Sequence, residues 1–115
     1  MSFINVVTGG TLDDVTLTGY TKHSYSAKTS SFVATSDNQI SICDCTSGAI
    51  TITLPAASDV LGMILTAKKI DSSVNALILD GNASETIDGA TTFSMATQYM
   101  SVSIFAGAAG AWYKI

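Results

Sequence analysis

The sequence ALILDGNASETIDGA occupies residues 76–90 and combines the signals of a strand and of two turns. Its apolar run, Ala76 to Leu79, has the length of a strand and no helical spacing. Two Asp-Gly pairs follow, Asp80-Gly81 and Asp88-Gly89. They predict turns, because glycine adopts positive φ readily and aspartate hydrogen-bonds to neighbouring backbone. Residues 85–87, between the two Asp-Gly pairs, predict a very short strand or a turn. We therefore expect a β-arch or hairpin corner, with both Asp-Gly pairs in structural turns and no catalytic set.

Alternation of apolar and polar residues continues on both sides of this corner and predicts further strands. The predicted strands cover residues 32–35, 39–44, 49–54, 63–69, 75–80, 91–96, 99–106 and 111–115. Pro55 cannot donate to a ladder and should end the strand before it, and residues 56–61 form one helical turn or a loop. The last two strands predict a hairpin. Short strands at near-regular spacing, without a convincing amphipathic helix, predict an all-β fold: a small antiparallel sandwich or barrel-like module.

Residues 1–30 lack this regular pattern, and we expect an extended N-terminal arm (1–30) before a β-rich module (31–115). Gly9-Gly10 interrupts the arm's apolar residues, and the polar stretch 21–29 has Tyr25 as its one anchor. Such a segment cannot by itself offset its ordering entropy, roughly 1–2 kcal/mol per residue for the backbone. Its apolar residues must be buried on its own domain or, the alternative we prefer, on a neighbouring subunit or partner. These candidate contact residues are Phe3, Ile4, Val6, Val7, Leu12, Val15 and Leu17.

Composition indicates a single domain that contacts other chains. The chain has 115 residues, which suits one domain. Only 12% of its residues are charged, against roughly a quarter in an average globular protein, and its mean hydropathy is +0.40. A surface of low charge usually marks contacts with other chains, so we expect an assembly subunit. The net charge of −4 and the absence of arginine argue against binding to nucleic acid, which requires basic residues to neutralise phosphates.

The chain shows no signs of secretion or of a membrane location. Its N-terminal residues lack a positive region followed by a long apolar run, and no apolar stretch approaches transmembrane length. We therefore expect synthesis and assembly in a cytoplasm and no membrane partner. Cys43 and Cys45 are two residues apart, so in a strand they face the same side. A disulfide between them would be strained and a metal site would need more ligands, so we expect two at least partly buried thiols.

The sequence carries no evident catalytic or cofactor-binding constellation. His23, the one histidine, lies in a polar segment without an evident carboxylate companion. Asp80, Glu85 and Asp88 are close in sequence, and their oxygens would suit calcium, but their spacing matches no known calcium loop. The glycines form no phosphate-binding pattern. We therefore expect no enzyme, no cofactor and no metal, with a small hydrolase as a weak alternative that rests on isolated carboxylates.

Several of these motifs together resemble a known module. The motifs are ITITLPAA (50–57), ILTAKKIDSS (64–73), LILDG (77–81), ETIDG (85–89) and WYKI (112–115). In order and spacing they resemble a β-rich structural module of tailed bacteriophages, which is similar at the ends of tail fibres and in small head proteins. The resemblance covers about residues 31–115. The arm has no match to this module, and we expect it to carry the particular role of the chain.

The resemblance implies a virion structural protein that is trimeric and non-enzymatic. In a fibre the module would end a much longer chain, whereas here Met1 precedes it by about 30 residues. We therefore expect a capsid decoration (cement) protein. As a homotrimer it would bind the major capsid protein on the outer surface of the head and reinforce the shell. The alternative is a receptor- or glycan-binding tail-fibre tip. The candidate sugar-stacking residues would then be Tyr20, Tyr25, Tyr99, Trp112 and Tyr113.

Overall fold

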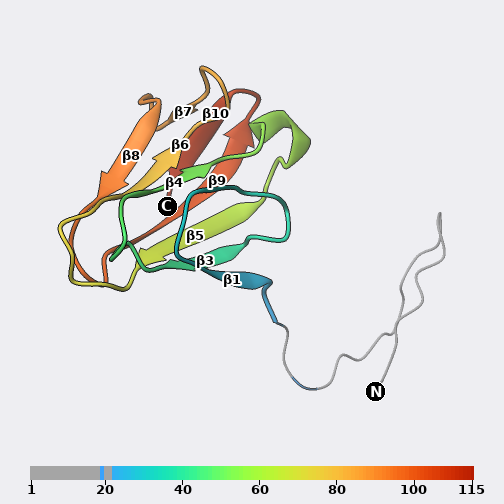
Figure 1. The fold of residues 1–115 in the computed structure, drawn as a ribbon. Helices are drawn as coiled ribbons and strands as arrows, with labels where there is room; N and C mark the ends of the chain where they lie inside the picture. The colour runs from blue at the N-terminus through green and yellow to red at the C-terminus, as the bar shows by residue number, and fades with distance from the viewer. Residues whose placement is uncertain (1–18, 20–21) are drawn as a thin grey trace.

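The computed structural model describes Gly19 and residues 22–115, which form a β-fold (Figure 1). The elements are β1 (Tyr25–Lys28), β2 (Phe32–Val33), β3 (Ile40–Cys43), β4 (Ile50–Thr53), the 3-10 helix η1 (Ala57–Asp59), β5 (Ile64–Lys69), β6 (Leu77–Asp80), β7 (Thr86–Ile87), β8 (Thr92–Met95), β9 (Ser101–Ala108) and β10 (Ala111–Lys114). The expected β-rich fold is confirmed, and every predicted strand overlaps an observed one. As expected, β4 ends before Pro55, which is followed by one helical turn. Within the described residues, no helix has the length and apolarity needed to cross a membrane.

The strands form two mixed sheets that pack as a sandwich. Sheet A has the order β1-β3-β5-β9-β10-β7, and sheet B has the order β2-β4-β6-β8. From β1 to β6 the chain alternates between the sheets, so that each strand lies beside the strand that came two before it. These neighbours run parallel: β1 with β3, β3 with β5, β2 with β4, and β4 with β6. Our expectation of an antiparallel sandwich is wrong for this half of the fold. The winding chain enters each sheet repeatedly in one direction, which gives parallel pairs.

The C-terminal half supplies the antiparallel pairs. β8 pairs with β6, and β9 pairs with both β5 and β10. The predicted hairpin of the last two strands is therefore confirmed, and Gly110 takes a φ of +78° in its turn. β7, the very short strand predicted between the two Asp-Gly pairs, lies parallel to β10 at one edge of sheet A.

The core lies between the inner faces of the sheets. Ile50 and Ile52 of β4 and Leu54, which follows it, alternate with half-buried threonines, and all three side chains are buried. Trp112 on β10 is the largest fully buried side chain. Burying one leucine or isoleucine side chain contributes about 1.5–3 kcal/mol. The alternation read from the sequence is therefore also the main source of stability.

The regular β-structure begins before residue 31, where we expected the β-rich module to start. Tyr25–Lys28, which we assigned to the extended arm, form β1 at the edge of sheet A, in parallel register with β3. We did not predict this strand, because residues 21–29 are polar. An edge strand buries little of its side chains and therefore needs few apolar residues. Here Tyr25 and Ala27 are exposed.

Candidate interaction surfaces

The outer faces of the two sheets differ in chemistry. On sheet B, Thr51 and Thr53 of β4 and Thr92 and Ser94 of β8 alternate with inward-facing residues, which gives a hydroxyl-rich face. On sheet A, Ser41 and Cys43 of β3 point into the core, and Ile40 and Ile42, which alternate with them, point outward. The outward residues of sheet A are thus mainly apolar, and we call this surface the open face. The register places on it Tyr25, Ile40, Ile42, Ile64, Phe105 and Tyr113.

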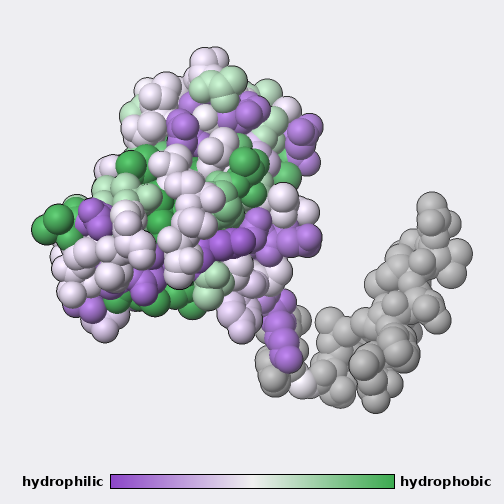
Figure 2. All heavy atoms as spheres, viewed as in Figure 1, coloured by the Kyte–Doolittle hydropathy of each residue, from purple (hydrophilic) through white to green (hydrophobic). Residues whose placement is uncertain are grey.

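Three of these six side chains are well exposed. Tyr25 is 70% exposed, Ile64 50% and Tyr113 41%. In the space-filling view, hydrophobic and hydrophilic residues are interspersed among wide areas of intermediate hydropathy (Figure 2). Exposed apolar side chains that share one sheet face often mark a contact site, whereas scattered single residues do not.

Few polar groups on the open face require water. Thr66 on β5 and Ser103 on β9 lie opposite each other, and their hydroxyl groups share a hydrogen bond of 2.8 Å. Lys68 also points to this side and lies at its margin, with Nζ 5.7 Å from the centre of the Tyr99 ring. Polar groups lie away from the centre of the face, with Ser101 beside Lys68 and the side chains of His23 and Gln39 at the pocket. Covering the centre, at Ile64, Phe105 and Tyr113, therefore removes few unpaired polar groups from water.

The ring of Tyr113 is held in place on this face. The rings of Phe105 and Tyr113 are 5.7 Å apart at their centres and tilted by 41°. Gly107 makes room for them, because a Cβ there would lie 2.6 Å from Cε2 of Tyr113 and 2.9 Å from Cε2 of Phe105. An aromatic side chain that is already ordered loses little conformational entropy when a partner covers it.

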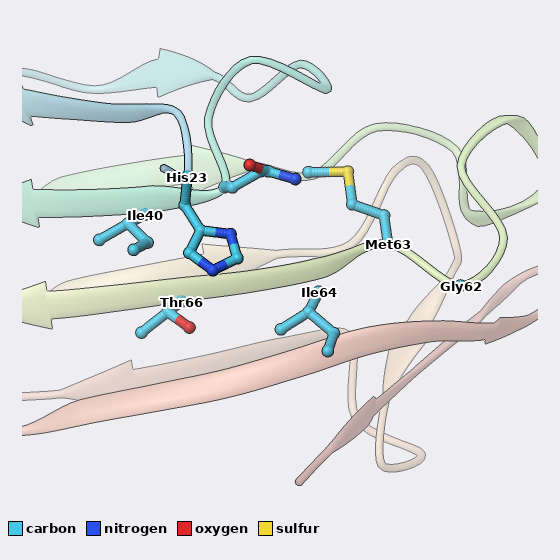
Figure 3. A pocket seen from close by; sticks show the side chains of 7 residues that line it. His23, Ile40, Gly62, Met63, Ile64 and Thr66 are labelled. Carbon is cyan, nitrogen blue, oxygen red and sulfur yellow. The ribbon is translucent and has the colours of Figure 1, made fainter. Parts of the chain in front are cut away.

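A pocket of about 400 Å³ indents the same face. Ile40, Met63 and Ile64 contribute apolar side chains to its wall, and Thr66 contributes a hydroxyl group. Figure 3 shows the imidazole of His23 extending over the strands toward the space among Ile40, Thr66 and Ile64. His23 lies two residues before the start of β1, so the chain enters sheet A along the wall of this pocket.

Loops at one end of the sandwich expose a second apolar group of residues. Val74 is 91% exposed, and Tyr99 and Met100 are also exposed. Tyr99 has a φ of +66°, a conformation that costs a bulky residue about 1–3 kcal/mol. Its backbone is held there because its N–H donates to the carbonyl oxygen of Lys69, at 2.7 Å. This geometry directs the tyrosine ring away from the core.

The motif KKIDSS forms a buried clamp beneath this end. The Nζ of Lys69, which is fully buried, donates to Asp71 Oδ2 at 2.8 Å, to the Asp71 carbonyl oxygen at 3.0 Å and to the Ser73 carbonyl oxygen at 2.9 Å. Asp71 Oδ1 accepts the Cys45 N–H at 2.7 Å, and Oδ2 accepts the N–H and the hydroxyl of Ser73. The clamp therefore joins the loop after β5 to the loop after β3.

Hydrogen bonding keeps the carboxyl group of Asp71 ionised within this clamp. Burial alone would raise its pKa, but the hydrogen bonds from Lys69, Ser73 and Cys45 outweigh that effect and hold the pKa well below its usual range. The ion pair and its hydrogen bonds thus have a structural role. The sequence motif gave no indication of them, because nothing in the residue types shows that Lys69 rather than Lys68 points inward.

Two carboxylates of the 80–90 corner each accept a hydrogen bond from a different backbone amide. Glu85 Oε1 accepts the Ala57 N–H at 2.9 Å, and Asp88 Oδ1 accepts the Lys114 N–H at 3.1 Å. Asp80 is the last residue of β6. Among the described residues, no three His, Cys, Asp or Glu side chains gather as a group that could hold a metal ion.

The two Asp-Gly pairs form different structures. Asp88 and Gly89 have φ values of +47° and +85°, and Ile87 and Ala90 pair on either side, so this pair forms the predicted tight turn. Asp80 ends β6, and the turn that follows lies at Ala83 and Ser84, so the turn predicted at Asp80-Gly81 is displaced along the chain. Gly81 is not in the left-handed region, and our expectation of positive φ there is wrong. Glycine is required there because a Cβ would overlap the carbonyl oxygen of Glu85.

The two cysteines are free and fully buried, as expected. Burial, and next the neighbouring Cys45, raise the pKa of the Cys43 thiol to about 12, although Lys28 opposes this. Burial and then Asp71 raise the pKa of Cys45. Both groups therefore remain protonated at neutral pH, and reactivity belongs to the thiolate. We expect neither thiol to react with a chromogenic disulfide reagent until the protein unfolds in urea. Prompt reaction of the folded protein would contradict the buried placement.

The structure separates the aromatic residues proposed for sugar stacking. Tyr25, Tyr99 and Tyr113 are exposed, whereas Trp112 is fully buried and has no face available to a ligand. Tyr20 lies outside the described residues. So do the candidate contact residues of the arm, Phe3, Ile4, Val6, Val7, Leu12, Val15 and Leu17.

Comparison with known proteins adds no relative. No family model matches the chain, and a search of curated proteins returned no match.

Proposed function

We propose that this chain is a structural protein of a bacteriophage virion, a capsid decoration (cement) protein. In this proposal it binds the outer surface of the head as a homotrimer, contacts the major capsid protein and stabilises the shell by bridging capsid subunits. The observation that carries the proposal is the open face of sheet A, which is almost uncharged and whose centre is apolar. Such a surface suits a subunit that works by covering other protein surfaces and performs no catalysis.

The two-sheet body would act as a rigid bridge. Seven of the eight strand pairings within the sheets join strands that are not consecutive in the chain, and the Lys69–Asp71 clamp fixes the loops at one end. A stable interface of standard size buries about 800 Å² on each partner. The apolar residues of the arm, Phe3 to Leu17, supply further area in this proposal and form the contact with the shell. The resemblance of residues 31–115 to phage virion modules supports the same role.

A second candidate function is the tip of a tail fibre that binds a receptor or glycan. Three exposed tyrosines favour it: Tyr25, Tyr99 and Tyr113. Tyrosine rings stack on the apolar faces of sugars while the hydroxyl group remains hydrated. The strained backbone of Tyr99 also fits a residue held ready for a ligand.

The proposed function is tested by co-sedimentation of the full-length chain with phage heads that lack their native decoration protein. We expect saturable binding, at a copy number that follows the capsid lattice, and increased resistance of the heads to heat. Deleting residues 1–18 should leave a folded protein, checked by circular dichroism, that binds heads weakly or not at all. No binding of the full-length chain to heads, together with binding to host cells or glycans, would refute decoration and support the fibre tip. A folded truncation that binds heads as tightly as the full chain would show that the arm is not the anchor.

A further inference from the structure

From the chemistry of sheet A, we infer that the open face is the surface through which copies of this chain associate with each other. The inference rests on the proposed homotrimer and assigns its contact to one face of the fold. The residues expected at its centre are Ile64, Phe105 and Tyr113, which lie side by side on β5, β9 and β10. The hydroxyl-rich outer face of sheet B would remain exposed to solvent.

Charge is the first argument for a second copy as the partner. The chain carries nine acidic residues and a net charge of −4, so two copies repel each other over most approaches. None of the six strands of sheet A contains Asp or Glu. This sheet is therefore a surface on which two copies can meet without bringing carboxylates together. Outside it, the sheet B face carries Asp80, and the 80–90 corner carries Glu85 and Asp88.

The lysines of sheet A support the same conclusion. Lys69 is buried in the clamp, Lys28 lies over the ring of Phe32, and Lys114 lies over the ring of Phe93 on sheet B. Lys68 is thus the one charged side chain that the described strands place on the open face, and it is at the margin. The single charge of Lys68 would attract an anionic partner only weakly, and the face has no charge that would attract a cationic partner. An apolar, uncharged surface matches this face best, and a second copy presents one.

The shape of the open face provides both a recess and a projecting group. The pocket between Ile40 and Ile64 is a recess, and Tyr25, 70% exposed on the neighbouring strand, is a projecting aromatic side chain. In a closed ring of identical subunits, a group that projects from one copy can enter a recess of the next. Buried aromatic anchors of this kind contribute most of the binding energy in protein interfaces.

The test compares substitutions on the two outer faces of the full-length chain by sedimentation velocity over a range of concentrations. Ile64→Lys and Tyr113→Lys each place a second charge on the open face, at side chains exposed enough to accept it without unfolding. Val33→Lys is the matched control, because Val33 is 67% exposed and lies at the edge of sheet B. We expect a wild-type trimer, dissociation constants raised at least about tenfold by either open-face substitution, and no change for the control. Thermal unfolding checks that each variant remains folded.

The outcomes separate this inference from the proposed function. A monomeric wild-type chain, or folded Ile64→Lys and Tyr113→Lys proteins that assemble as the wild type does, would overturn the inference. Equal dissociation of Val33→Lys would also overturn it, because the effect would then not belong to the open face. Head binding is measured separately. A chain that associates through the open face and does not bind heads would refute decoration and support the inference. A monomer that binds heads would support decoration and refute the inference.

Discussion

Replacing Lys69 with methionine is expected to lower the free energy of unfolding by about 3–5 kcal/mol. The substitution keeps the aliphatic volume and removes the cation that donates to Asp71 Oδ2 and to the carbonyl oxygens of Asp71 and Ser73. The carboxylate would then be buried beside two carbonyl oxygens without its counter-charge, which is the costly way to break a buried pair. Urea denaturation followed by circular dichroism measures the loss.

Lys68→Met is the matched control for this substitution. Lys68 precedes Lys69 on the same strand and points to the open face, where its interactions are weak, so we expect a change of at most about 0.5 kcal/mol. If both variants unfold at the same urea concentration as the wild type, the clamp contributes nothing to stability.

The Lys69–Asp71 pair should also make the free energy of unfolding depend on pH in the acid range. The pKa of Asp71 is lowered in the folded state, so its ionised form stabilises the protein above the ordinary aspartate pKa of about 4. That contribution is lost as the pH falls below about 4, toward the lowered folded value. In the Lys69→Met variant, protonation instead relieves an unpaired charge, and its deficit relative to the wild type should shrink in acid. A deficit that does not depend on pH would contradict this account.

The second large effect is expected at Gly81. Gly81→Ala should destabilise the protein by about 3 kcal/mol, because the new Cβ would overlap the carbonyl oxygen of Glu85 and lie 2.8 Å from its carbonyl carbon. The contacting atoms of Glu85 belong to the backbone, so they cannot relieve the overlap by a change of rotamer, as a flexible side chain can. The corner must therefore open, and it carries the bond between Glu85 and the Ala57 N–H. Thermal unfolding of the purified variant measures the change.

Gly89→Ala serves as the comparison for Gly81→Ala. Gly89 has a φ of +85° and open space where a Cβ would be, so alanine there suffers only backbone strain, about 1 kcal/mol. We therefore expect the loss at Gly81 to be clearly the larger. The reverse order would mean that the close approach of residues 81 and 85 is not maintained in solution.

The sequence alone was sufficient to place most strands, because period-2 alternation is a local property of the chain. Ile50, Ile52 and Leu54 alternate with threonines, Pro55 ends their strand, and the Asp88-Gly89 turn follows from the dipeptide itself. The burial of Cys43 and Cys45 on one side was also predicted. Each of these features depends on residues within a few positions of one another, and no distant contact is needed to specify them.

Only the tertiary structure decided how the strands pair and which face is inside. Alternation assigns Ile40 and Ile42 to one face of β3 and Cys43 to the other, but the position of sheet B makes the isoleucine face the outer one. The parallel winding, the inward direction of Lys69 and the contact of Gly81 with residue 85 likewise depend on neighbours distant in sequence or on the path of the backbone. Residue types specify which side chains can be buried, and the packing of the two sheets determines which of them are.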